Sequence, residues 1–315
     1  MEYRMLGNTG IPVSRLCFGS LAISPLQADL PVQEGAAVIR YAFERGVNFI
    51  DTAELYQNYS YIREALKGYP QEVVIATKCY AYLASDMYNS LKRALKEMNR
   101  EYIDIFMLHE QESADTIRGH WDALEYLLRA KEKGIIRAVG LSTHHIACVE
   151  AAAKIPEIDV IHPLYNYKGI GIRDGTAGEM LSAIKAAKEA GKGLYGMKAL
   201  AGGHLLSDAE RALKHVLSIN EFDAIAVGMQ SPLEVEYNTR LFNGQPISKD
   251  LYETLRRKPR KIIIEDWCVK CGRCVKACKS RALSLTTDKL RVFPEKCCLC
   301  GYCAAACPEF CIKVI

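Results

Sequence analysis

The chain lacks several features that would each assign its class directly. No run of about 18 apolar residues occurs in its 315 residues, which excludes a membrane-spanning helix. No apolar signal segment precedes Pro12, so we expect a cytoplasmic protein rather than an exported one. Low-complexity stretches are missing too. The composition, 50% hydrophobic and 25% charged, is typical of a globular protein with one large core and a small appendage.

Cysteine is scarce in most of the chain and crowded at its end. Only three of the 13 cysteines, Cys17, Cys79 and Cys148, fall in the first 250 residues. The other ten lie between Cys268 and Cys311. In a cytosolic chain, a dense and regular cluster of this kind indicates metal binding rather than disulfides.

Eight of these cysteines form two copies of the pattern C-x2-C-x2-C-x3-C, which is typical of 4Fe–4S proteins. Three thiolates on one tight loop can bind three irons of a cube, and the fourth ligand must then come from elsewhere. A shift of 29 residues superposes the two copies and also places Gly272 on Gly301. The same shift places Cys298 and Cys311 on apolar positions, so we expect both to be buried and not ligands. Zinc is disfavoured because neither copy contains histidine.

From about Ile262 to Ile315 the tail resembles the two-cluster bacterial ferredoxins. Lys279 stands where that pattern usually has proline, but the change removes no ligand. The resemblance implies two 4Fe–4S clusters with interleaved ligands. Cluster 1 would be bound by Cys268, Cys271, Cys274 and Cys307, and cluster 2 by Cys297, Cys300, Cys303 and Cys278.

The tail is also basic. Residues 256–315 hold 14 Lys and Arg against 5 Asp and Glu, whereas the rest of the chain holds 27 against 32. Each oxidised cluster with its thiolates carries about −2, so two clusters offset roughly 4 of the 9 excess positive charges. We therefore favour a docking surface for an acidic electron carrier, such as a ferredoxin or flavodoxin, over a nucleic-acid or membrane partner.

Before Leu255, short β-branched runs alternate with longer helical patterns, as in βα units around a parallel sheet. Eight such runs in about 250 residues fit a (β/α)8 barrel. An open doubly wound sheet would usually carry G-x-G-x-x-G after its first strand, and none follows Leu16–Phe18. We predict an α/β chain with a TIM barrel over residues 1–255 and a small α+β ferredoxin-like iron–sulfur domain over 256–315.

Polar residues follow several of the predicted strands, where barrel enzymes carry their chemistry. Asp51, Lys78 and His109 end consecutive runs, and Tyr56 lies five residues beyond Asp51. A nearby ammonium lowers the pKa of a tyrosine, a carboxylate holds the ammonium, and a histidine can orient a carbonyl oxygen. Each residue alone could equally be structural. Four together favour a carbonyl-reduction site.

The segments Asp51–Tyr56, Ala76–Lys78 and Met107–His109 resemble the catalytic segments of aldo-keto reductases, and the similarity covers about Met1 to Phe242. The resemblance implies Tyr56 as general acid, with Lys78 and Asp51 lowering its pKa. It also implies His109 as the group that orients a small-molecule carbonyl substrate. The whole chain looks like the aldo-keto reductases that carry a C-terminal ferredoxin domain.

The same resemblance implies a nicotinamide cofactor at the mouth of the barrel. NADH is favoured over NADPH because Glu234 falls where the family usually has an arginine that grips the 2′-phosphate. The pair Gly202-Gly203 is a candidate phosphate contact, with a plain loop as the alternative. The cofactor-binding residues would be Ser142, Thr143, His162, Met197, Lys198, Gly202, Gly203, Gly228, Met229, Gln230, Glu234 and Asn238.

A flavin is a further candidate in the barrel. A 4Fe–4S cluster passes single electrons whereas nicotinamide gives a hydride, and a flavin handles both. The leading hypothesis is an oxidoreductase that reduces a carbonyl or conjugated carbonyl and exchanges electrons through the clusters. The alternatives are a nicotinamide-dependent reductase whose clusters are structural or sense oxygen, and an electron carrier with a non-catalytic barrel.

Overall fold

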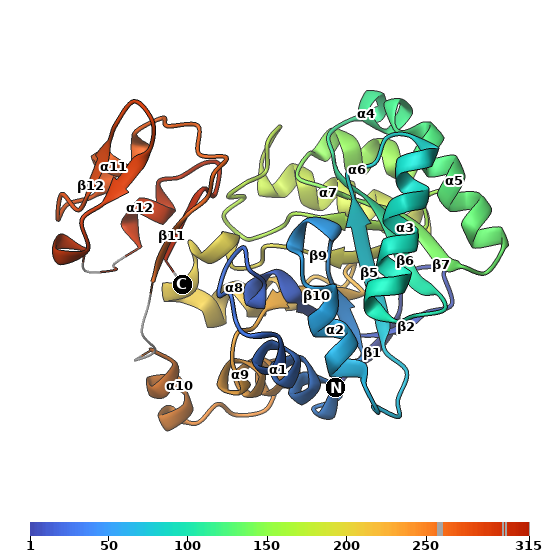
Figure 1. The fold of residues 1–315 in the computed structure, drawn as a ribbon, viewed down its shortest axis with the longest axis horizontal. Helices are drawn as coiled ribbons and strands as arrows, with labels where there is room; N and C mark the ends of the chain where they lie inside the picture. The colour runs from blue at the N-terminus through green and yellow to red at the C-terminus, as the bar shows by residue number, and fades with distance from the viewer. Residues whose placement is uncertain (257–260, 298, 300, 315) are drawn as a thin grey trace.

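The computed structural model describes residues 1–256, 261–297, 299 and 301–314. Eight parallel strands close into a barrel in the order β10-β3-β4-β5-β6-β7-β8-β9, which confirms the predicted fold (Figure 1). These strands are β3 (Leu16–Gly19), β4 (Phe49–Asp51), β5 (Val74–Cys79), β6 (Ile103–Gln111), β7 (Ile136–Thr143), β8 (Val160–Pro163), β9 (Gly193–Gly196) and β10 (Ala224–Gly228).

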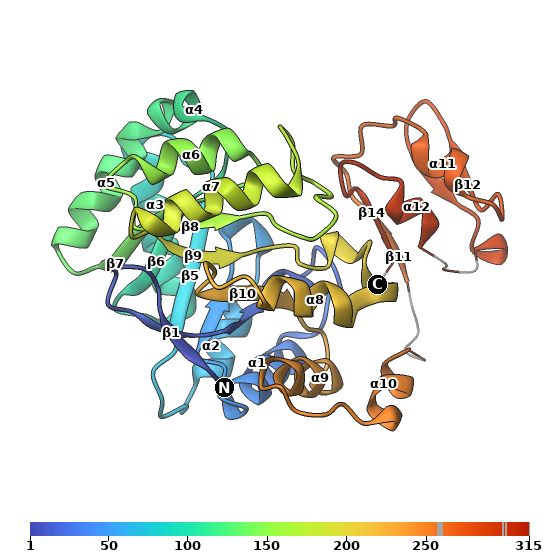
Figure 2. The same ribbon diagram turned by 180° about the vertical axis from the view of Figure 1, so that it is seen from behind.

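Helices surround the strands on the outside of the barrel (Figures 1 and 2). Thr176 and Glu179 form a capping box at the start of α7, and Ser231 caps α9 ahead of Pro232. The helices are α1 (Val32–Glu44), α2 (Tyr59–Leu66), α3 (Ala84–Met98), α4 (Ala114–Gly119), α5 (Trp121–Glu132), α6 (Ile146–Ala153), α7 (Ala177–Glu189), α8 (Ala209–Leu217), α9 (Pro232–Phe242) and α10 (Lys249–Arg256).

The barrel strands are buried on both faces, and their side chains alternate between two cores. In β6, Ile105 and Met107 pack in the barrel interior, whereas Phe106 and Leu108 pack under the helices. This alternation follows from the two-residue period of a strand. The interior is therefore filled with side chains, and ligands have access only at an end of the barrel.

A hairpin of β1 (Tyr3–Met5) and β2 (Pro12–Ser14), which the strand pattern does not predict, closes the N-terminal end of the barrel. Its Leu6 and Ile11 are fully buried in the interior core. Gly7 approaches the backbone of Gly193, at the start of β9, so closely that a Cβ atom would lie 2.2 Å from that nitrogen. The open end is thus the one where the strands terminate.

The C-terminal domain retains the internal repeat in its backbone. Strand β11 (Ile262–Ile264) pairs with β14 (Ile312–Val314), and β12 (Leu283–Leu285) pairs with β13 (Leu290–Val292). A shift of 29 residues carries β12 onto β14. Gly272 and Gly301 both have left-handed φ angles, 74° and 82°, and each precedes a short helix. Those helices are α11 (Arg273–Ala277) and α12 (Tyr302–Ala305).

The small domain lies beside the open end of the barrel (Figures 1 and 2). Strand β14 packs against η3 (Ala201–Gly203), a short 3-10 turn that follows β9. In the described ranges, none of the helices is both long enough and apolar enough to cross a bilayer.

Candidate active site and iron–sulfur centre

Four residues converge at the open end of the barrel. Asp51 ends β4, Lys78 lies near the end of β5, and His109 lies near the end of β6. Tyr56 ends η2 (Glu54–Tyr56), a turn that follows β4. All four line one cavity of about 1920 Å³. Small-molecule pockets usually measure about 300–1,000 Å³, so this cavity has room for a large cofactor and a substrate together.

The pair Asp51–Lys78 is buried and tightly bonded. The Lys78 ammonium donates to Asp51 Oδ1 at 2.7 Å, to Asp51 Oδ2 at 2.9 Å and to the Thr52 carbonyl at 2.9 Å. These three acceptors engage all three of its protons. The Tyr195 hydroxyl also donates to Asp51 Oδ1 at 2.9 Å. Tyr195 was missed from the sequence because the candidates were polar residues at or after the ends of the predicted apolar runs, and Tyr195 lies within such a run.

The prediction that Lys78 and Asp51 lower the pKa of Tyr56 is wrong for this structure. Burial raises the pKa of Tyr56 well above its usual value, and the charges of Asp51 and Glu110 raise it further. The Lys78 nitrogen lies 5.1 Å from the centre of the Tyr56 ring. Because Asp51 neutralises the ammonium and lies near the phenol, the net effect on the phenolate is unfavourable.

His109 is neutral, and one of its buried nitrogens has no hydrogen-bond partner within the described part of the chain. Burial, with Lys78 as the next cause, lowers the pKa of His109 well below its usual value. Its ring stacks on Tyr80 at 4.4 Å between centroids. Its Nδ1 makes no hydrogen bond to any residue that the structure describes. A buried polar atom of this kind is costly unless a ligand or water engages it, so the site fits a polar substrate group at this point.

Ten of the twelve predicted cofactor residues line the cavity, and Thr143 and Met229 do not. The Thr143 hydroxyl accepts the His145 N–H at 2.9 Å, and Met229 is fully buried in the core under the helices. His162 stacks on Tyr195 at 3.8 Å, and burial lowers the pKa of His162 to about 4, so it is neutral. The cavity therefore reaches from the four catalytic residues to the start of α9, and the ten residues form part of its wall. Its size and lining fit a dinucleotide.

The start of α9 already carries a carboxylate. Glu234 Oε2 accepts the Gln230 N–H at 2.7 Å, and Ser231 Oγ accepts the Glu234 N–H. Asn238 is held in turn by the Glu234 carbonyl, to which it donates at 2.8 Å. A helix N-terminus usually attracts anions, but here an acidic side chain of the chain itself satisfies the backbone donor.

Gly202, in the turn that follows β9, contacts the small domain. Gly202 has φ 60°, and a Cβ atom there would lie 2.7 Å from Cδ1 of Phe310. A Cβ on Gly171 would likewise lie 2.5 Å from the Phe310 ring. Gly171 and Gly202 thus form a notch for the phenyl ring of Phe310, which is 6% exposed. The predicted phosphate contact at Gly202 competes with this packing.

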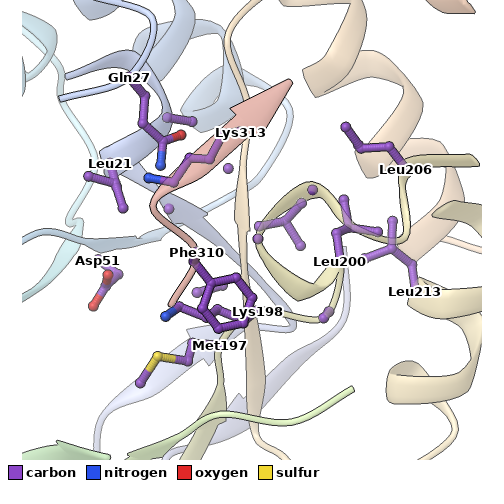
Figure 3. Close-up of a pocket in the computed structure, with 18 of the residues that line it drawn as sticks. Leu21, Gln27, Asp51, Met197, Lys198, Leu200, Leu206, Leu213, Phe310 and Lys313 are labelled. Atoms are coloured by element: carbon purple, nitrogen blue, oxygen red, sulfur yellow. The ribbon is translucent and has the colours of Figure 1, made fainter. Parts of the chain in front are cut away.

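Further contacts hold the two domains together. Arg173 of the barrel donates two hydrogen bonds to Glu309, at 3.0 and 2.7 Å. The small domain also contributes Glu265, Trp267, Glu309, Phe310 and Lys313 to the lining of the catalytic cavity. Figure 3 shows Phe310 beside the barrel residue Lys198, and Lys313 in another part of the same pocket.

The four thiols predicted to bind cluster 1 lie in one part of the small domain. Burial raises the pKa of the Cys274 thiol. The negative charges of the neighbouring thiolates of Cys307, Cys268 and Cys271 raise it further. The same four line a small cavity together with Cys311. Among the described residues, no three His, Cys, Asp or Glu side chains are close enough to share one metal ion. A cube needs wider spacing, because each thiolate binds a different iron.

The second ligand set is described only in part. Cys278, Cys297 and Cys303 are placed, and Cys300 lies outside the described residues. The Cys278 sulfur accepts the Ala282 N–H at 3.2 Å, and the Ser280 hydroxyl lowers the pKa of Cys278, which suits a thiolate.

The two cysteines predicted not to be ligands differ in what the structure shows. Cys298 lies outside the described residues. Cys311 is buried and donates to the carbonyls of Trp267 and Glu309, and burial raises its pKa to about 12. A protonated thiol of this kind behaves as a small apolar side chain.

Comparison with known proteins agrees with this arrangement. Residues 15–221 match the aldo/keto reductase family, and residues 260–308 match a 4Fe-4S dicluster domain. The chain therefore belongs to the aldo/keto reductase family and is an oxidoreductase.

Relatives of known sequence and structure cover mainly the barrel. L-galactose dehydrogenase of Arabidopsis thaliana is 23% identical over 76% of this chain and 87% of its own length. The aldo-keto reductase YhdN of Bacillus subtilis is 27% identical over 53% of this chain and 54% of its own length. The holo form of an aldo-keto reductase from Bacillus halodurans has the same fold, with TM-score 0.66 and 22% identity over 82% of this chain and 96% of its own.

Proposed function

We propose that the protein reduces a carbonyl or conjugated carbonyl group in the barrel and exchanges electrons through two 4Fe–4S clusters. The observation that carries the proposal is the shared cavity: one pocket is lined by Asp51, Tyr56, Lys78 and His109 and also by five residues of the small domain. A domain with a purely structural role would not need to reach the catalytic group.

The cysteines proposed to bind cluster 1 are close along the chain to residues that line this pocket. Cys307 precedes Phe310 by three residues, a distance of at most about 11 Å along an extended chain. Phe310 is buried against the barrel, and Trp267, the neighbour of Cys268, lines the same cavity. Reduction of a carbonyl to an alcohol takes two electrons and two protons. Two one-electron clusters match that number of electrons, Tyr56 can supply the proton for oxygen, and the proton for carbon would come from solvent at the open end of the barrel.

The chain's own residues bind the substrate and manage its proton. The neutral His109 can donate to the carbonyl oxygen and orient it. Tyr56 is protonated, because its pKa is raised, and can deliver a proton to that oxygen. Asp51 and Thr52 fix Lys78 near the Tyr56 ring, where its positive charge can offset only part of the cost of the phenolate that Asp51 and burial impose.

A nicotinamide bound in the cavity would supply a hydride, and a flavin would connect hydride and single-electron chemistry. We propose NADH over NADPH because the Glu234 carboxylate occupies the start of α9. The residues that would hold the dinucleotide are Ser142, His162, Met197, Gly228, Gln230 and Asn238.

The electron partner is proposed to be an acidic carrier such as a ferredoxin or flavodoxin. Arg273 and Lys276 of α11 are exposed beside the cysteines of cluster 1. A carrier of this kind and the clusters themselves both fit a reducing compartment, so we place the protein in the cytoplasm.

The test is anaerobic visible spectroscopy of the reconstituted protein. The clusters are reduced with a stoichiometric amount of dithionite, cinnamaldehyde is added as a conjugated carbonyl probe, and the cluster absorption is followed. We expect the aldehyde to reoxidise the clusters at least a hundredfold faster in the wild type than in Tyr56→Phe.

Either of two results would contradict the proposal. Steady NADH-dependent aldehyde reduction with clusters that neither bleach nor recover would make the clusters structural. Equal reoxidation in Tyr56→Phe and the wild type would make the barrel a scaffold for an electron carrier.

A further inference from the structure

Lys198 places a positive charge in the wall of the catalytic cavity. It follows β9 and is partly buried. Its φ angle is 57°, in the left-handed region that a residue with a side chain rarely adopts, and such conformations gather at functional sites. Figure 3 shows its side chain beside the Phe310 ring, in the pocket that also contains Asp51.

The Lys198 ammonium has hydrogen-bonding capacity to spare. It lies 3.1 Å from His144 Nε2 and 4.6 Å from the centre of the Phe310 ring. His144 is neutral, because burial and Lys198 lower its pKa well below the usual value. One ammonium proton therefore goes to His144, while the aromatic face supports the charge without accepting a full hydrogen bond.

No carboxylate among residues 1–256, 261–297, 299 and 301–314 forms an ion pair with Lys198. The neighbouring cations differ in this respect: Arg173 pairs with Glu309 at 2.7 Å, and Lys313 pairs with Glu265 at 2.5 Å. The nearby Glu110 accepts the Tyr80 hydroxyl at 2.7 Å and lies 3.8 Å from His144.

An ammonium that faces a cavity without a counter-ion favours an anionic ligand group. Another part of the cavity wall, at the start of α9, carries the Glu234 carboxylate. That carboxylate disfavours an anionic ligand group there. The wall at Lys198 therefore favours a negatively charged ligand group and the wall at α9 disfavours one. Asp51, Tyr56, Lys78 and His109 line the same cavity.

We propose that Lys198, positioned by His144 and Phe310, binds a carboxylate of the substrate, so that the preferred substrates are carbonyl compounds that also carry an acid group. The reduction of these substrates rests on the proposed function, whereas the binding of their carboxylate by Lys198 does not. Phe310 belongs to the small domain, so the acid site is complete only when the two domains are docked.

The first experiment measures binding without turnover. The reconstituted full-length protein is titrated calorimetrically with 4-(hydroxymethyl)benzoate and with the neutral 4-(hydroxymethyl)benzamide. We expect the acid to bind about ten- to a hundredfold more tightly, as for a hydrogen bond to a charged group, and Lys198→Met to abolish the difference. Lys185→Met, on the exposed face of α7, is the matched control and should keep it.

The second experiment measures turnover of 4-carboxybenzaldehyde against 4-formylbenzamide. We expect Lys198→Met to raise KM for the acid and leave KM for the amide and the affinity for NADH unchanged. Equal affinity for acid and amide in the wild type would overturn the site. So would a loss of NADH affinity as large as the loss of acid affinity, which would assign Lys198 to the cofactor's phosphates.

Borohydride trapping of the aldehyde on Lys198 would also overturn the proposal, because the lysine would then be a nucleophile. Failure of the proposed function gives a different result: the acid would still bind through Lys198, but neither aldehyde would be reduced. If Lys198→Met does not fold, the pH dependence of binding in the wild type, argued below, provides the test.

Discussion

Asp51 is the residue on which most of the catalytic group depends. It accepts two hydrogen bonds from Lys78 and one from Tyr195, all in a buried site. We expect Asp51→Asn to destabilise the protein by about 3–5 kcal/mol, because it leaves the Lys78 charge buried and unpaired. Urea unfolding measures this, with the exposed pair Arg129–Glu125 as control. Glu125→Gln should change the free energy of unfolding by at most about 1 kcal/mol, and an equally small effect for Asp51→Asn would show that the buried pair is not needed.

Glu234 is expected to set the cofactor preference. In Glu234→Gln the side-chain oxygen can still accept the Gln230 N–H, while the negative charge is lost. Removing a like charge near a phosphate is worth about 1 kcal/mol at the surface, so NADPH affinity should rise roughly fivefold. Fluorescence titration with both cofactors measures the change. NADH affinity should stay constant, and a parallel rise for both would mean that Glu234 does not discriminate.

Lys198 predicts a pH dependence of acid binding. Burial lowers its pKa to about 8, Glu110 opposes the shift, and Lys313 and Arg173 add to it. His144, the other titratable group in contact, is neutral across this range. The ammonium is present below pH 8 and lost above it. The affinity for 4-(hydroxymethyl)benzoate should therefore be level from pH 6 to about 7.5 and fall as the pH rises through about 8, with the amide unaffected. A flat profile for the acid would contradict the site.

At the scale of elements, the turn η3 connects the barrel to the small domain. Gly202→Ala would place a Cβ 2.7 Å from the Phe310 ring. Gly10→Ala is the matched control, because Gly10 also has a left-handed φ, 70°, but no atom within 4 Å of its Cβ. We expect Gly202→Ala to lower the free energy of unfolding by about 1–3 kcal/mol more than Gly10→Ala and to speed proteolysis between the domains. Equal effects of the two substitutions would show that only backbone strain matters at Gly202.

The elements differ in how well the sequence predicts them. Parallel strands buried on both faces appear as short apolar runs with polar residues at their ends, so the barrel and the positions of Asp51, Lys78 and His109 were predictable. The hairpin β1–β2 was not, because three-residue strands carry little periodicity. The raised pKa of Tyr56 depends on burial and on Glu110, which sequence spacing does not reveal. The notch at Gly171 and Gly202 depends on Phe310, more than 100 residues away.

At the scale of the whole molecule, charge is divided between the two domains. Residues 256–315 carry an excess of basic residues, whereas the rest of the chain carries an excess of acidic residues. Oppositely charged surfaces speed association, and salt screens the effect over about 8–10 Å at physiological ionic strength. A soluble acidic carrier should therefore dock on the small domain, near Arg273 and Lys276, rather than on the barrel.

This division of charge predicts that cluster reduction by a reduced acidic flavodoxin depends on salt. We expect the second-order rate constant to fall at least tenfold between 20 and 500 mM NaCl. The double charge reversal Arg273→Glu with Lys276→Glu should slow the reaction by a similar factor at low salt. Reduction by the small reductant dithionite should respond little to the reversal, which separates docking from damage to the clusters. Reversal of Lys185 on α7, also to Glu, is the control for net charge. If that control slowed the flavodoxin as much as the α11 reversal does, the carrier would be responding to total charge, and the clusters would receive electrons without a defined docking site.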